Sequence, residues 1–175
     1  HYGTTDTLEG FSVDASGSGP LTIGGATISG GVAASLTLTG TSAHSNTVSG
    51  VMADGNAAVG GLGLIKDGSG TWVLAASNTY SGTTTIKAGR LALAAPGYIG
   101  ENSVWIYKGA TFDVSGKTGA YVISANQFLT GQGTIRGDLA VGGGVWPYYP
   151  GPGVMTFEDD LTLDDAVLLV LADRL

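Results

Sequence analysis

A glycine-led strand pattern returns about every 20 residues through the second half of the chain. Each copy is a glycine followed by a short, mostly alternating run, and the copies are residues 70–74, 89–93, 109–114, 133–136 and 153–157. Their leading glycines stand 19, 20, 24 and 20 residues apart. Such a period is typical of a solenoid, in which each coil of chain stacks on the coil before it. The pattern therefore predicts an all-β solenoid, a fold in which repetition adds length.

Short strands are expected outside these copies as well. Residues 21–23 and 36–39 alternate apolar side chains with Thr or Ser, which is the period-2 pattern of a strand with one buried face. Clusters rich in Gly, Asn, Asp and Ser, such as 66–70 and 78–82, read as the turns between strands. At roughly 20–25 residues per coil, the chain is expected to make seven or eight short coils.

We expect a single solenoid domain over residues 1–175. Its coils are degenerate in 1–58 and closest to the repeat in 59–171. Composition supports a folded chain, because 43% of the residues are hydrophobic although 31 are glycine. Charged residues make up only 12% of the chain, as expected where turns need glycine and coil interiors exclude charge.

Charge excludes two classes of partner. The formal net charge is −7, and the seven Lys and Arg residues are scattered singly, so the basic footprint that nucleic acid or an anionic membrane surface requires is missing. No apolar run reaches the roughly 18 residues of a membrane span. The chain has no cysteine and therefore no disulfide or thiolate site. Because it begins at His1 without a signal-like segment, we expect either a processed chain or a piece of a larger product.

Six stretches together resemble the autotransporter-associated β-strand repeat family. They lie in the order that the family shows, and they are residues 64–74, 76–84, 86–91, 108–114, 129–135 and 160–163. The resemblance implies a right-handed parallel β-helix in a bacterial secreted or surface protein, such as an autotransporter passenger or an adhesin-like chain. It implies no catalytic residues and no cofactor, because the matched positions are turn and core residues.

Five acids near the C-terminus form the densest cluster of carboxylates: Glu158, Asp159, Asp160, Asp164 and Asp165. Paired carboxylates can hydrolyse glycosides or bind calcium. A solvated turn explains the same residues and is the favoured interpretation. The Gly-Gly-x-Gly-x-Asp repeat that binds calcium in other solenoids does not occur.

Other candidates for chemistry are sparse. His44 is the only histidine besides His1, and it lies in a turn-like segment without acid or cysteine neighbours, so we expect neither catalysis nor metal binding there. A polysaccharide-active enzyme would need acids aligned with a basic residue on one flank. Four basic residues are available for this, but the sequence does not align them with the acids: Arg90, Arg136, Lys87 and Lys108. We therefore expect no enzyme activity, no metal and no cofactor.

Residues 145–153 form an aromatic, proline-rich segment that is read as a stiff loop. Trp146, Tyr148 and Tyr149 could stack on sugars or dock a protein partner. The alternative is that these rings fold back and cover the flank of the solenoid.

The apolar tail breaks the strand alternation. Its candidate residues for self-association are Val167, Leu168, Leu169, Val170 and Leu171. The tail could be a strand buried on both faces, or a short helix that caps the end of the solenoid. It could also pair with another copy of the chain, or with the next coil of a longer parent.

Two functions from different classes remain. The first is a non-enzymatic extracellular structural solenoid that joins end to end with copies of itself into a surface fibre or sheath. The second is a stalk or adhesin segment that binds glycan or a surface protein through residues 145–153.

Overall fold

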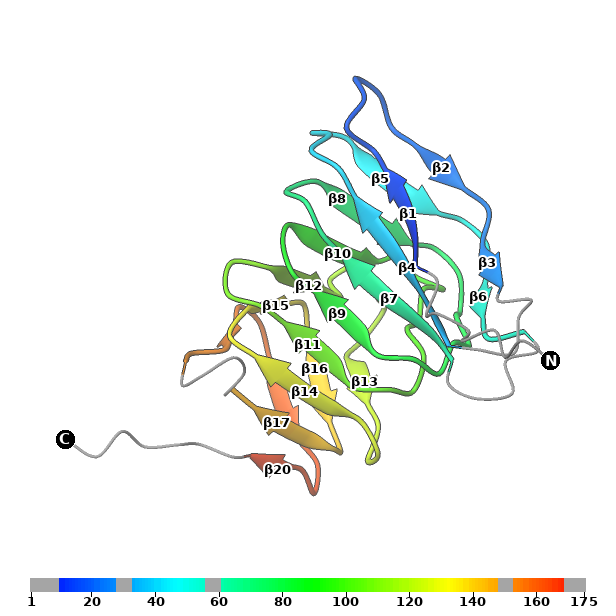
Figure 1. Cartoon of the computed structure of the whole chain (residues 1–175). Coiled ribbons are helices and arrows are strands. Elements are labelled where there is room, and N and C mark those ends of the chain that lie inside the picture. The colour runs from blue at the N-terminus through cyan, green and yellow to red at the C-terminus, as the bar shows by residue number, and fades with distance from the viewer. Residues whose placement is uncertain (1–9, 28–32, 56–60, 148–152, 169–175) are drawn as a thin grey trace.

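The chain forms a stack of short strands that runs from β1 and β2 at one end to β20 at the other (Figure 1). The computed structural model describes residues 10–27, 33–55, 61–147 and 153–168. These residues contain 20 strands and no helix. Each strand pair is parallel, so the predicted all-β solenoid is confirmed.

The strands belong to two large sheets and two small ones. The largest sheet has eight strands, in the order β1 (Gly10–Asp14), β4 (Ala34–Thr39), β7 (Leu62–Lys66), β9 (Thr84–Ile86), β11 (Val104–Ile106), β14 (Phe128–Gly131), β17 (Gly144–Trp146) and β20 (Val167–Leu168). The second has seven, in the order β18 (Thr156–Phe157), β15 (Thr134–Arg136), β12 (Thr111–Asp113), β10 (Arg90–Leu93), β8 (Thr71–Leu74), β5 (Ser45–Val48) and β2 (Thr22–Ile23). The small sheets are β13 (Tyr121–Ile123), β16 (Leu139–Val141) and β19 (Leu161–Leu163), and β3 (Ala26–Thr27) with β6 (Met52–Ala53).

Each coil contributes one strand to each large sheet through most of the stack. The eight strands of the largest sheet are roughly consistent with the seven or eight coils expected from the sequence. The first coils have an additional short strand on a further side, β3 and β6, and the later coils have one from β13 onward.

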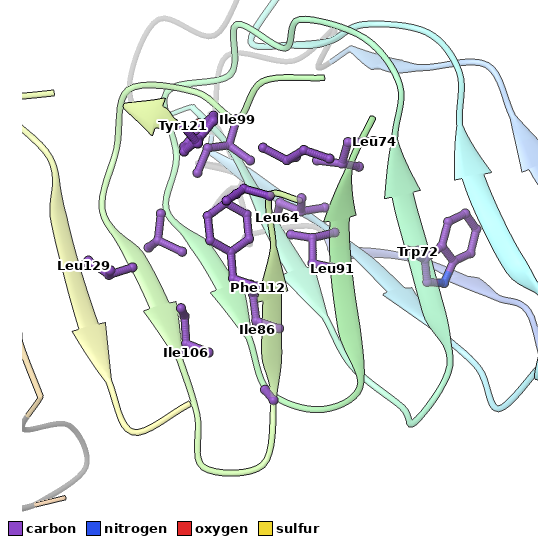
Figure 2. Close-up of a cluster of buried hydrophobic side chains, with 14 of the residues drawn as sticks. Leu64, Trp72, Leu74, Ile86, Leu91, Ile99, Ile106, Phe112, Tyr121 and Leu129 are labelled. Carbon is purple, nitrogen blue, oxygen red and sulfur yellow. The ribbon is translucent and has the colours of Figure 1, made fainter. Parts of the chain in front are cut away.

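The core is a set of side-chain ladders in register. Val48, Leu74 and Leu93 occupy matching positions on β5, β8 and β10, and all three are buried. Figure 2 shows that side chains from both large sheets meet in one interior, with Leu64 and Leu91 among them. Burying each such side chain contributes about 1.5–3 kcal/mol. A parallel register keeps like side chains above one another, so an apolar repeat produces a continuous core.

Buried amides join neighbouring coils where the turns approach the core. The Asn78 side-chain oxygen accepts a hydrogen bond from the backbone N–H of Met52, at 2.9 Å, in the preceding coil. Its amide nitrogen donates to the carbonyl of Tyr98, at 2.6 Å, in the following coil. Asn46 likewise accepts from the backbone N–H of Leu21 and donates to the carbonyl of Thr71. These amides pair backbone groups that the strand ladders leave over.

A buried lysine also forms hydrogen bonds with backbone carbonyl groups, at another turn. Lys66 faces the interior at the end of β7 and is fully buried. Its Nζ donates to the carbonyls of Asp67, Gly68 and Ala88, at 2.7, 2.8 and 2.9 Å. Gly89 follows with φ of +65°, and a Cβ there would lie 2.8 Å from that Nζ. Only glycine suits a position that combines this backbone conformation with so close an approach.

Replacing Asn78 with Ala should lower the free energy of unfolding by about 1–3 kcal/mol, because the Met52 N–H loses its side-chain partner and the Tyr98 carbonyl keeps only its bond from the Asn78 backbone N–H. Chemical denaturation followed by circular dichroism measures the change. Asn126 is exposed, so Asn126→Ala is the matched control and should change stability by less than about 0.5 kcal/mol. Equal effects in the two variants would contradict a bridging role for Asn78.

Lys66 should make stability rise with pH. Burial lowers its pKa to about 8, although the nearby Asp67 charge raises it. A lysine in the unfolded chain has a pKa of about 10.4. Between these values the unfolded state binds more protons, so the free energy of unfolding should increase by about 1–2 kcal/mol from pH 8 to pH 9.5.

Urea denaturation of wild type and Lys66→Met at both pH values isolates this contribution. The wild-type increase should exceed that of Lys66→Met, since the variant lacks the titrating amine. Parallel stability curves for the two proteins would show that the folded amine titrates normally.

Candidate functional site

The C-terminal edge of the largest sheet is strand β20. It pairs with β17, with Val167 opposite Gly144 and Leu168 opposite Val145. Val167 is 64% exposed and Leu168 is 46% exposed. Two of the expectations for the tail are therefore wrong at these residues, since they form neither a helix nor a strand buried on both faces. Leu169, Val170 and Leu171 lie outside the described residues.

The opposite edge of the same sheet also exposes an apolar side chain. Strand β1 is the first strand in the spatial order, and its Phe11 is 59% exposed. Within the described residues, no strand pairs with the outer side of β1 or of β20. An edge of this kind presents unpaired backbone N–H and C=O groups to any strand of matching direction.

Trp146 lies in strand β17, so the segment expected to be a loop from residue 145 begins as a strand. The Trp146 ring packs against Phe128 of β14, with centroids 4.6 Å apart and an angle of 33° between the planes. Its side chain remains 38% exposed. Gly144 makes the packing possible, because a Cβ there would lie 2.6 Å from the Phe128 ring. Tyr148 and Tyr149 lie outside the described residues.

The acidic cluster is divided among separate turns. A carboxylate oxygen of Asp159 accepts a hydrogen bond from the backbone N–H of Gly137, at 2.7 Å. Glu158 lies 3.9 Å from Arg136, and both side chains are about half exposed. In the part of the chain that the structure describes, no three His, Cys, Asp or Glu residues group as metal ligands would. The favoured reading of these acids as turn residues agrees with their positions.

Two other residues that the sequence offered as candidates for chemistry, His44 and Arg90, make structural contacts. His44 is exposed at a bend, where its carbonyl accepts a hydrogen bond from Asn46. Arg90 forms an ion pair with the buried Asp113 of the neighbouring strand β12. Asp113 also accepts hydrogen bonds from the backbone N–H and the hydroxyl of Ser115. This carboxylate is therefore committed to holding a turn and a strand pair together.

A surface hollow that the sequence did not indicate lies between two adjacent coils. Its volume is about 550 Å³, and it is lined by residues 77–81 of one coil and by residues 98 and 100–102 of the next. Sequence reasoning identified 78–82 only as a turn. Nothing in the sequence showed that this turn lies beside Tyr98, although a spacing of 20 residues, one coil, was the available signal.

The geometry defines the class of the protein as a parallel β-solenoid built from short repeated coils. Residues 64–93 match the family model of the passenger-associated-transport-repeat, so they carry the repeat associated with autotransporter passengers. This stretch begins within β7 and ends with β10, so it includes strands of two successive coils. No curated protein matches the chain, and no solved structure matches it.

The repeat family suggests a secreted or surface location and a passenger-type structural segment. In the described ranges, no helix is long and apolar enough to cross a membrane.

Proposed function

We propose that this chain is a non-enzymatic structural segment of a secreted or surface protein and that its copies join end to end. The observation that carries the proposal is that the two end strands of one sheet, β1 and β20, have no outer strand partner within the described residues and both expose apolar side chains. The passenger-type repeat at residues 64–93 supports the structural class. The proposal assigns no catalytic residue.

The parallel arrangement makes the two ends complementary. Each strand of the largest sheet runs in the same direction, so a second copy translated along the stack would place its β1 beside β20 as one more parallel strand. The exposed side chains of Val167 and Leu168 would then lie near the exposed Phe11 side chain of that copy. The contact joins two different surfaces, and such head-to-tail contacts produce open filaments unless a rotation closes them into a ring.

Replacing Leu168 with Lys should block this association, because charge on an edge strand opposes further strand pairing. Wild type should form filaments of uniform width in negative-stain electron microscopy, and larger species in sedimentation velocity as concentration rises. Leu168→Lys should need at least a tenfold higher concentration. Val122→Lys is the matched control, since Val122 is an apolar side chain, 55% exposed, on β13, which follows β12 and precedes β14 along the chain and is not an end strand of the largest sheet.

Wild-type protein that stays monodisperse at high concentration would overturn end-to-end association. So would a Val122→Lys variant that loses assembly as fully as Leu168→Lys, because general surface charge would then explain both results.

A second candidate function rests on the ring pair of Trp146 and Phe128. A half-exposed indole supported from behind by another ring can stack on a sugar or dock a protein partner. This function would make the chain a stalk or adhesin segment with its contact surface at residues 145–153.

Trp146→Ala tests this candidate. Binding to immobilised cell-surface polysaccharide should fall at least tenfold in this variant, because the stacking ring is lost, while assembly by sedimentation is unchanged. Val122→Ala should retain binding. Undiminished binding by Trp146→Ala would exclude the ring pair as the contact.

A further inference from the structure

The hollow between residues 77–81 and 98–102 has a rigid frame. The backbone N–H of Asn78 donates to the carbonyl of Tyr98, at 3.1 Å, and the N–H of Tyr98 donates to the carbonyl of Ala76, also at 3.1 Å. Both oxygens of the Asp54 carboxylate accept from the backbone N–H of Ser81, at 2.9 and 3.0 Å. The positions of both walls are therefore fixed by backbone hydrogen bonds to neighbouring coils.

One wall provides an aromatic surface. Tyr98 lines the hollow and is partly buried, and its ring packs against Tyr121, with centroids 5.6 Å apart and planes tilted by 42°. Tyr121 is in turn buried in the core that Figure 2 shows, next to Phe112. Tyr80 lies deeper, with its hydroxyl 2.7 Å from Thr84. Tyr98 is thus a ring supported by the core and only partly covered.

Gly100 allows the two walls to approach. A Cβ at this position would collide with the carbonyl oxygen of Tyr80, so any other residue would push the coils apart. The hollow depends on this glycine for its shape.

The rim of the hollow carries exposed and partly exposed polar residues. Thr79, Ser81 and Glu101 are exposed and Asn102 is partly exposed. Within the described residues, the side chains of Thr79, Glu101 and Asn102 make no hydrogen bond to another residue. Burial and the Glu101 charge both raise the pKa of Tyr98, which is consistent with Glu101 lying on the same side as the Tyr98 hydroxyl.

We propose that this hollow is a binding site for an uncharged oligosaccharide, with Tyr98 stacking on a sugar ring and Glu101 and Asn102 bonding its hydroxyls. A supported aromatic ring beside free carboxylate, amide and hydroxyl groups matches the apolar face and polar edge of a pyranose. The volume lies in the range of small-ligand sites. Among the described residues that line it, Glu101 alone is charged, and the chain carries a net charge of −7, so an acidic sugar would be repelled.

The test uses the whole chain and four named probes: cellobiose, maltose, N,N′-diacetylchitobiose and a glucuronate-containing hyaluronan disaccharide. Proton–nitrogen correlation NMR should show saturable shifts at residues 77–81 and 98–102 with at least one neutral disaccharide at millimolar concentration. The glucuronate disaccharide should bind at least tenfold more weakly than that neutral probe.

Variants then assign the contacts. Tyr98→Leu and Asn102→Ala should each weaken binding at least fivefold, while Glu101→Gln should weaken neutral-sugar binding less and reduce the discrimination against glucuronate. Glu101 is exposed and Asn102 is partly exposed, so those two variants keep the test decisive if Tyr98→Leu lowers stability. Trp146→Ala should leave binding at this hollow unchanged, which separates it from the ring pair of the second candidate function.

Absence of shifts for all three neutral disaccharides would overturn the proposal. Binding that is retained in Asn102→Ala and Glu101→Gln, or that shifts residues near Trp146 instead, would also overturn it. These results do not depend on whether copies of the chain associate end to end, because the Leu168→Lys variant can serve as the background for each experiment.

Discussion

Hydrogen bonding between parallel coils is the constraint on which the rest of this structure depends. A short strand cannot pair its own backbone N–H and C=O groups. Each coil therefore forms these hydrogen bonds with the coils on either side. The core follows from the same arrangement, because an in-register stack places Val48, Leu74 and Leu93 above one another. Among the described residues, β1 and β20 have a strand partner on one side only, so the backbone groups on their outer sides are left unpaired by other strands.

Buried polar side chains form hydrogen bonds with backbone N–H and C=O groups that the strands leave unpaired. Asn78, Asn46 and Lys66 sit among apolar residues, yet hydrogen bonds to backbone groups engage each of their polar ends. Asp54 does the same at the surface. Burial raises its pKa, but hydrogen bonds from Ser81 and Leu62 outweigh that effect and hold the pKa below its usual range. Hydrogen bonds from these side chains to the backbone hold the turns in place, although the chain has few charged residues.

The sequence predicted the local elements well because their causes are local. Alternation predicted strands such as β8 and β10, and glycine spacing predicted that they stack. The tail was harder to predict, because a run such as Val167–Leu168 suits an edge strand, a buried strand or a helix until its neighbour β17 is known. Trp146 was read as part of a loop because the prolines that follow dominate the pattern. The hollow beside Tyr98 depends on which two turns become neighbours, and only the three-dimensional stack determines that.

The amide bridges have a consequence for how such chains diverge. Asn78 bonds backbone groups of the coils before and after it and does not need a matching asparagine in either. Substitution in one coil is therefore compatible with unchanged neighbours, provided that the bridging residue and the inward apolar positions persist. Successive coils can lose sequence similarity to one another while the stack continues. This is consistent with a family model that matches residues 64–93 and parallel pairing that extends from β1 to β20.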